Sequence, residues 1–167
     1  MFSAIRDALV TAKQSRTSLR VVHFSVQADH LHVLVEAADS DALCLGARGL
    51  AIRLARSINR ALGRAGGVWG DRYHMRALCT PREVRHGLVY VLMNFKKHIP
   101  GARGLDPMSS AAACDGLRDL ALRSEALLPA LCRPRTWLLH TGWRRHGLIA
   151  LCDAPRGSSR AATSDGS

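Results

Sequence analysis

Residues 19–37 read LRVVHFSVQADHLHVLVEA, and this stretch decides the fold. Residues 19–27 and 30–37 both alternate between side chains of opposite character, and the intervening Ala28-Asp29 is short enough to form a turn. This pattern predicts a β-hairpin. In the first strand apolar residues alternate with polar ones, namely Val22, Phe24 and Val26 with His23, Ser25 and Gln27.

The second strand carries the most informative motif, His30-Leu31-His32. Residues i and i+2 of a strand share a face, so the two imidazoles project side by side while Leu31, Val33 and Val35 point the other way into a core. Two neutral imidazoles can chelate one divalent metal ion. Many paired strand histidines bind nothing, however, and the motif alone leaves both interpretations open.

The rest of the chain supplies helices on either side of this hairpin. Thr80-Pro81-Arg82-Glu83 forms a capping box with proline at the first helical position. We expect helices at 2–14, 41–64, 80 to about 98, and 117–128, with residues 68–79 ending in a short strand. The order α-β-β-α-β-α predicts an α+β fold with an antiparallel sheet.

Charge is the second strong signal. The chain of 167 residues has 24 Lys and Arg against 13 Asp and Glu, a net charge of +11. Such a surface favours polyanions, and arginine suits bidentate contacts with phosphate. A genome rich in G and C would explain the preference for arginine over lysine, but not the excess of positive charge.

Composition narrows the class of protein further. No run of 18 apolar residues is present, so we expect no transmembrane helix. The five cysteines are odd in number and scattered, which indicates reduced thiols rather than a disulfide framework.

Four arginines recur along the predicted helix 41–64 at helical spacing: Arg53, Arg56, Arg60 and Arg64. They would form one basic stripe, which is either a solvated helix face or a contact surface for phosphates.

A second set of polar residues lies on the predicted helix after Thr80. Tyr90 and Asn94 are four residues apart and are therefore expected on one face, which His86 and Lys97 extend. A tyrosine in the middle of a helix is usually a core residue, so this pair alone indicates no chemistry.

Four blocks together resemble the IS200-like single-tyrosine (HUH-type) transposases, and most closely their REP-associated branch. Residues 29–36, DHLHVLVE, match the family pattern NHhHhlv, and Asn59-Arg60 matches an Asn near the end of the following helix. Trp69-Gly70-Asp71-Arg72-Tyr73 matches a W/F-x-x-R-Y/F segment, and residues 90–94, YVLMN, match Y-h-x-h-N. The order and spacing of all four blocks agree over roughly residues 4–98.

The resemblance implies a DNA strand-transfer enzyme. In the family a Mg²⁺ or Mn²⁺ ion is held by residues that correspond to His30, His32 and Asn94, and the nucleophile corresponds to Tyr90. The implied reaction cleaves and rejoins single-stranded DNA through a 5′-phosphotyrosine intermediate. DNA contacts would come from basic residues: Arg53, Arg56, Arg60, Arg64, Arg72 and Lys97. Tyr73 is the competing nucleophile.

The resemblance also implies partners and location. The substrate would be hairpin ends formed by inverted repeats, and the protein would be a monomer or homodimer. It would be cytoplasmic and nucleoid-associated in a bacterium, without a membrane partner.

The implied fold is a ferredoxin-like or RRM-like antiparallel sheet with helices packed on one face, plus a helix that bears the tyrosine. The family fold begins with a strand before the first helix, whereas this sequence begins inside that helix. A misassigned start or a truncation would explain this, and would leave an unpaired edge beside the histidine strand. Residues 1–100 are the expected transposase domain, 101–152 a basic and aromatic extension, and 153–167 a disordered tail.

Two other functions compete with this one. A catalytically impaired or domesticated protein of the same ancestry could bind single-stranded DNA or hairpins through its basic and aromatic residues. Histidine-triad hydrolases and two-motif cyclic phosphodiesterases fit poorly. Position 34 is Leu rather than a third alternating His, and no His-x-Thr or His-x-Ser pair of motifs is present.

Overall fold

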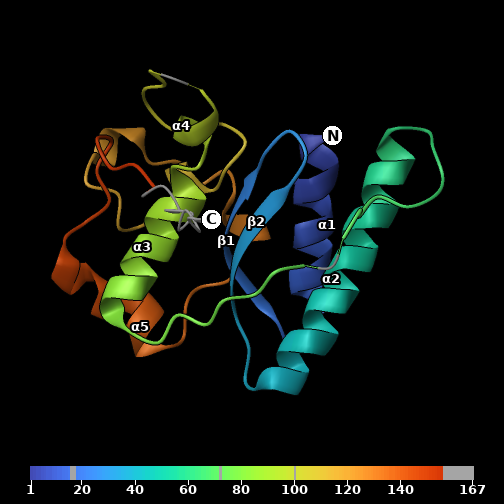
Figure 1. Ribbon diagram of the computed structural model, residues 1–167, viewed down its shortest axis with the longest axis horizontal. Coiled ribbons are helices and arrows are strands. Elements are labelled where there is room, and N and C mark those ends of the chain that lie inside the picture. Colours follow the sequence, from blue (N-terminus) through green and yellow to red (C-terminus); the bar gives the residue numbers. More distant parts are fainter. Residues whose placement is uncertain (16–17, 72, 100, 156–167) are drawn as a thin grey trace, which may run out of the picture.

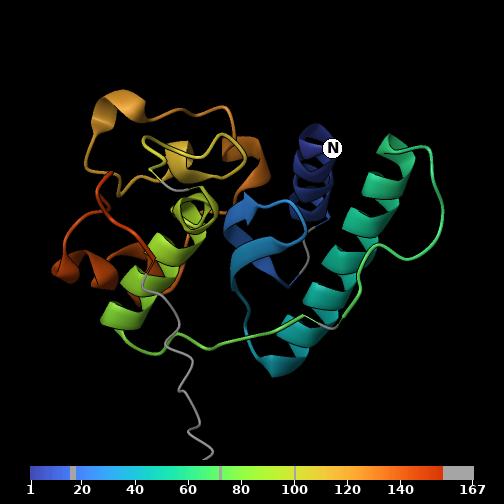
Figure 2. The ribbon, with the colours of Figure 1, turned by 45° about the horizontal axis from the view of Figure 1, so that its top comes forward.

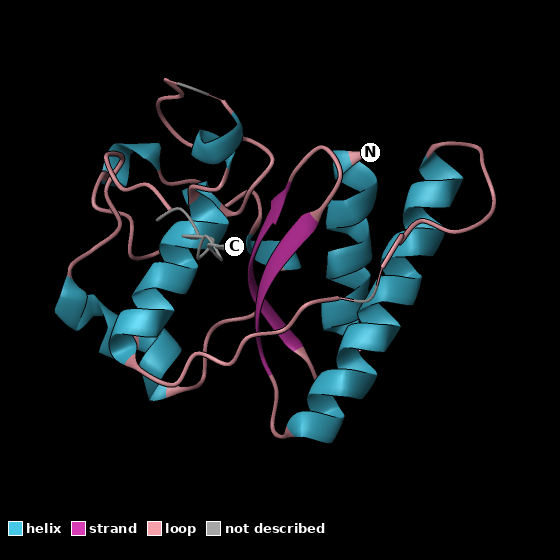
Figure 3. Cartoon of the chain, in the orientation of Figure 1, coloured by secondary structure: helices cyan, strands magenta, loops and turns pink. Residues whose placement is uncertain are grey.

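The computed structural model describes residues 1–15, 18–71, 73–99 and 101–155. The elements that it contains follow the chain in this order: α1 (Phe2–Gln14), β1 (Arg20–Val26), β2 (Leu31–Glu36), α2 (Ser40–Ala61), α3 (Pro81–Leu92), α4 (Phe95–His98) and α5 (Trp137–His140). Short 3₁₀ turns lie at Ala111–Ala113, Leu120–Leu122, Leu128–Ala130 and Gly142–His146. The predicted α+β class is confirmed (Figure 3). None of the described helices combines the length and apolar character needed to span a bilayer.

The hairpin is an antiparallel pair of strands in the centre of the molecule (Figure 1). Its register pairs Ser25 with His32 and Phe24 with Val33, but it is irregular between Val21 and His23. The expected regular alternation of Val22, Phe24 and Val26 with polar residues is therefore wrong, because a β-bulge reverses the direction of alternation. Val22 packs in the core beside α3, whereas Phe24 packs with α1 and α2.

Helices cover both faces of the hairpin, as Figures 1 and 2 show. One apolar cluster joins Phe24 and Val26 of β1 to α1 and α2, through residues such as Leu9 and Leu54. The other joins Leu34 of β2 to α3 and to residues after 101. The hairpin is therefore a layer between two cores, and its α3 side holds the side chains of His30 and His32.

The helix expected to run from 80 to about 98 is instead interrupted. The capping box at Thr80 is present as predicted, but α3 ends at Leu92 and α4 begins at Phe95. All residues from Val91 to Phe95 are buried, which one face of a straight α-helix cannot achieve. The chain tightens there, because Lys96 N–H donates to Met93 O and Lys97 N–H donates to Asn94 O, three residues back instead of four.

Two further predictions of secondary structure were wrong. Residues 73–79 form no strand, because most of their side chains are exposed and no neighbouring strand pairs with them in the described chain. Leu78 of this connector packs over Gly87 of α3, where a Cβ would lie 2.7 Å from the leucine Cδ1. In place of a helix at 117–128 there is a 3₁₀ turn at Leu120–Leu122, whose leucines are exposed rather than turned to a core.

The chain after residue 101 completes both cores. Ala111, Trp143 and Ile149 are buried against α3, and Ala130 and Leu131 are buried against the α1 side. The same region covers the outer edge of β1, where Val26 N–H donates to Met108 O and Cys132 N–H donates to Val21 O. The division at residue 100 stays a prediction.

On its other side, β2 has no third strand among the described residues. Most of the tail expected to be disordered, residues 156–167, lies outside the described residues.

Candidate active site

His32 of β2 and His30, the residue just before this strand, form the centre of the candidate site. Their ring centroids are 4.6 Å apart, and the rings meet edge to face at 73°. Leu34, two residues after His32, packs in the α3 core, whereas Leu31 and Val35 pack on the α1 side. The strand period therefore places both imidazoles on one face, as the sequence predicts, and this face is the one toward α3. The expected core on the opposite face is wrong in part, because Leu34 on the histidine face is buried and Val33 is exposed.

Tyr90 of α3 lies against this pair. Its ring centroid is 4.9 Å from that of His32, at an interplanar angle of 76°, and its side chain is 38% exposed. The competing Tyr73 lies in the exposed connector, and no ring contact with His30 or His32 is recorded for it among the described residues. The structure thus brings His30 and His32 together with Tyr90, although 58 positions separate His32 from Tyr90 in the sequence.

The short helix α4 adds two basic side chains. Lys97 Nζ lies 4.4 Å from the centroid of the Tyr90 ring, a cation–π arrangement. The His98 ring lies 5.6 Å from that of His30. His98 was not among the predicted site residues, because it lies on α4, beyond the interruption of the expected helix. Lys97 was expected to contact DNA, and in the structure its side chain lies beside Tyr90.

Asn94, the third expected metal ligand, is buried, whereas Tyr90 is partly exposed. It is 1% exposed and lies between α3 and α4, because the helix expected to carry both residues is interrupted. Both its Oδ1 and its Nδ2 are buried without a hydrogen-bond partner. No hydrogen bond therefore links the Asn94 side chain to His30 or His32 among the described residues.

The two imidazoles have different surroundings. Burial, together with the nearby His30, Lys97 and His98, lowers the pKa of His32 to about 4. His32 is thus neutral at pH 7, and its Nε2 is buried without a partner. His30 Nδ1 lies 2.6 Å from Asp29 Oδ1, and this hydrogen bond lowers the pKa of Asp29.

The donors at this site fit a divalent ion in part. Three of the five unpartnered buried side-chain atoms in the described chain belong to His32 and Asn94, and such atoms are costly unless something binds them. No group of three or more His, Cys, Asp or Glu side chains arranged to hold a metal is found in the described ranges. The expected ligands His30, His32 and Asn94 are not such a group, because the third of them is an amide.

The basic stripe lies away from this site. Arg56 and Arg60 are exposed on α2, whereas Arg53 is half-buried and donates to Ser15 Oγ at 3.2 Å. Arg64 follows the end of α2. Because α2 and α3 cover opposite faces of the hairpin, the stripe and Tyr90 are on different sides of the molecule (Figure 2). Arg72 lies outside the described residues.

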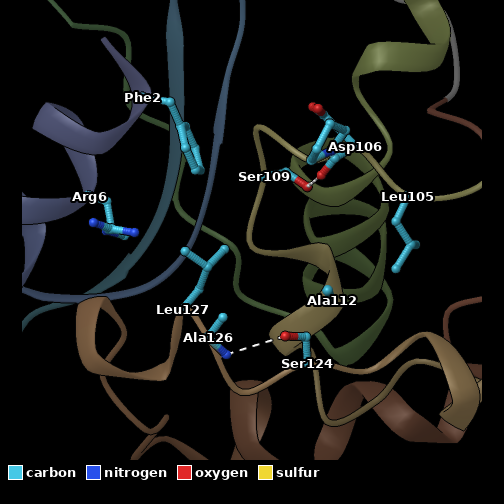
Figure 4. A pocket seen from close by; sticks show the side chains of 10 residues that line it. Phe2, Arg6, Leu105, Asp106, Ser109, Ala112, Ser124, Ala126 and Leu127 are labelled. Atoms are coloured by element: carbon cyan, nitrogen blue, oxygen red, sulfur yellow. Dashed lines mark hydrogen bonds between the residues drawn. The ribbon is translucent and has the colours of Figure 1, made fainter.

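A cavity of about 310 Å³ lies between the start of α1 and the loops at 105–112 and 124–127. Figure 4 shows Phe2 and Leu127 facing Ser109 and Ala112 across it, with Ala126 N–H donating to Ser124 Oγ at 3.3 Å. None of the predicted site residues lines this cavity.

The chain was compared with protein-family models, with curated proteins and with solved structures, and no match was found.

Proposed function

We propose that this chain is a metal-dependent single-tyrosine transposase of the IS200-like type, with a ferredoxin-like fold, that cleaves and rejoins single-stranded DNA. The observation that carries the proposal is the contact of Tyr90 with His32, 4.9 Å between ring centroids, beside a second imidazole at 4.6 Å. This arrangement joins a nucleophile to a chelating pair, which is the combination that phosphoryl transfer by a tyrosine requires.

In this proposal His30, His32 and Asn94 hold Mg²⁺ or Mn²⁺. When bound, the ion polarises the scissile phosphate and stabilises charge on the leaving oxygen. The neutral state of His32 at pH 7 supports its part in this, because a neutral imidazole offers a nitrogen lone pair. The unpartnered oxygen of Asn94 supports a third ligand from the α3–α4 junction.

Tyr90 is the proposed nucleophile. Its oxygen attacks the scissile phosphorus, the bond from phosphorus to the 3′ oxygen breaks, the phenol gives up its proton and the leaving oxygen takes one up. The product is a 5′-phosphotyrosine and a free 3′-OH, so the ester bond is retained and rejoining needs no ATP. Free tyrosine has a pKa of about 10, so a tyrosine nucleophile needs activation by a metal ion or a neighbouring base.

The proposed substrate is single-stranded DNA at hairpin ends, and a net charge of +11 favours such a polyanion. With Lys97 at the tyrosine, the exposed arginines of α2 are proposed to contact DNA that flanks the cleavage site. A cytoplasmic, nucleoid-associated monomer or homodimer is part of the same proposal.

The test is covalent capture of DNA. Labelled hairpin DNA is incubated with the full chain and Mn²⁺ or Mg²⁺, and the adduct is resolved under denaturing conditions. We expect wild type and Tyr73→Phe to form the adduct and Tyr90→Phe to lose it, because only the phenol oxygen at position 90 is near the histidines. If none of the three proteins forms an adduct while DNA binding persists, the catalytic proposal is wrong.

A non-catalytic, DNA-binding protein of the same ancestry is the second candidate. Trp69 favours it, since its indole N–H donates to Ala51 O at 3.0 Å and its ring is still 41% exposed beside α2. A fixed and exposed aromatic ring is a surface on which bases stack. Binding of the hairpin by all three proteins without any adduct would support this function.

A further inference from the structure

The turn of the hairpin places a carboxylate against the first histidine of the pair. Asp29 Oδ1 lies 2.6 Å from His30 Nδ1, a short hydrogen bond. A carboxylate can only accept, so Nδ1 of His30 carries the proton in this hydrogen bond, and in the neutral imidazole the lone pair is then on Nε2. The backbone of the turn is fixed as well, because Gln27 N–H donates to His30 O at 2.9 Å.

A free Nε2 is the state that a metal-binding imidazole needs. Histidines that bind metals usually donate their other ring N–H to a carboxylate or a carbonyl, which fixes the tautomer and the ring orientation and strengthens the donor nitrogen. The neighbouring His32 also has an unpartnered Nε2. Each of the two neutral rings therefore offers one nitrogen lone pair to a metal ion. In His30, the hydrogen bond to Asp29 determines that this lone pair is on Nε2.

We propose that Asp29 is a positioning residue that holds His30 in the Nδ1–H tautomer and thereby raises the affinity of the site for a divalent cation. This inference rests on the proposed function, in which His30 is a ligand. Asp29 itself does not contact the metal or the DNA in this proposal.

The chain contains a matched control for an incidental surface contact. Arg6 and Asp7 are also adjacent in sequence, and the Arg6 guanidinium lies 3.1 Å from Asp7 Oδ1 on an exposed part of α1. Asp7→Ala removes the same charge as Asp29→Ala but lies on the other face of the hairpin from the histidines. A general effect of charge on cation binding would be the same in both variants.

The experiment measures Mn²⁺ affinity by calorimetry for the full chain, because Mg²⁺ prefers oxygen ligands and is the weaker probe of imidazoles. We expect Asp29→Ala to weaken Mn²⁺ binding by about 10- to 100-fold, the usual range for the partner of a metal-binding histidine. Asp29→Asn should lose less, because its amide oxygen still accepts from Nδ1. Asp7→Ala should bind as wild type does, and His30→Ala should lose most.

A second readout follows the tautomer directly. Nitrogen-15 chemical shifts of the metal-free protein should show His30 protonated on Nδ1 in wild type and Asp29→Asn, and a mixture of tautomers in Asp29→Ala. A merely structural role for this exposed side chain would not move these shifts.

The outcomes separate the two proposals. If His30→Ala weakens Mn²⁺ binding but Asp29→Ala changes neither affinity nor tautomer, the role of Asp29 is wrong and the metal site stands. If wild type and His30→Ala bind Mn²⁺ equally, the metal site is wrong, and the role of Asp29 in metal binding is wrong with it.

Discussion

His23 is a buried histidine that makes the stability of the fold depend on pH. It lies on β1 with Nδ1 3.0 Å from Ser110 Oγ, and burial lowers its pKa to about 4, although Asp115 acts in the opposite direction. In the unfolded chain the pKa is about 6.5, so between pH 6.5 and 4 the unfolded state binds more protons. Stability is therefore full above pH 6.5 and falls as the pH is lowered through this window.

We expect His23 to contribute a loss of roughly 3 kcal/mol in the free energy of unfolding between pH 7 and pH 4. Urea unfolding at several pH values measures this loss. His23→Gln should show a smaller pH dependence than wild type, whereas His74→Gln, which changes an exposed histidine of the connector, should match wild type. Equal pH dependence in all three proteins would contradict the assignment to His23.

At the scale of residues, the sequence predicts those features of the site that depend on local geometry. The pairing of His30 with His32 needs only the two-residue period of a strand, and it is confirmed. The burial of Asn94 depends on the interruption between α3 and α4, which arises from packing after the helix has formed. The contact of His98 with His30 depends on the same interruption, so the pattern of the sequence alone did not reveal it.

The helix α2 carries two glycines with opposite surroundings. A Cβ at Gly46 would lie 2.3 Å from Leu19 Cβ, whereas a Cβ at Gly49 would meet nothing within 4 Å. Gly46 therefore permits the close approach of α2 to the start of β1, and Gly49 has no such role.

We expect alanine at these two positions to change stability in opposite directions. Gly46→Ala should lower the free energy of unfolding by about 1–3 kcal/mol, because the Leu19 Cβ is fixed to the backbone and cannot move aside freely. Gly49→Ala should raise it by about 0.5–1 kcal/mol, the usual preference for alanine in a helix interior. Thermal or urea unfolding measures both, and a stabilised Gly46→Ala variant would show that the approach is not tight.

At the scale of elements, prediction succeeded where an element has its own start signal. The Thr80 capping box opens α3 in the structure, with Glu83 N–H donating to the threonine side chain. Residues 73–79 have no partner strand within the part of the chain that the structure describes, and a strand exists only with its neighbour. In residues 117–128, Leu117 is buried in the α3 core and Leu127 packs against the other core, whereas Leu120 and Leu122 between them are exposed, so the segment has no single apolar face.

At the scale of the whole molecule, the chain after residue 101 takes part in the same cores as the hairpin. Trp143 is buried against α3, and its indole N–H donates to Leu139 O at 3.1 Å. Its ring covers Gly116, where a Cβ would lie 2.1 Å from the Trp143 Cη2 atom. The sequence indicated a basic and aromatic extension here, but patterns within a segment do not reveal which distant segment covers it.

We expect Gly116→Ala to destabilise the whole protein rather than its last third. The added methyl group must displace a buried indole ring, which costs about 1–3 kcal/mol and disturbs the core that Trp143 shares with Leu34 of the histidine strand. Far-UV circular dichroism should show one unfolding transition, lowered in midpoint, because most of the helical signal comes from α1, α2 and α3. The control is Gly67→Ala, where a Cβ meets nothing within 4 Å, and it should unfold as wild type does.

Amide hydrogen exchange locates the effect of Gly116→Ala within the molecule. If the two cores unfold together, protection should fall in β1 and β2 as much as in residues 111–117, because the hairpin lies between the cores and contributes side chains to both. Loss of protection confined to residues after 101, with the hairpin unchanged, would contradict this coupling and would instead support an extension that unfolds by itself. In that case the histidine pair would depend on α3 alone for its rigidity.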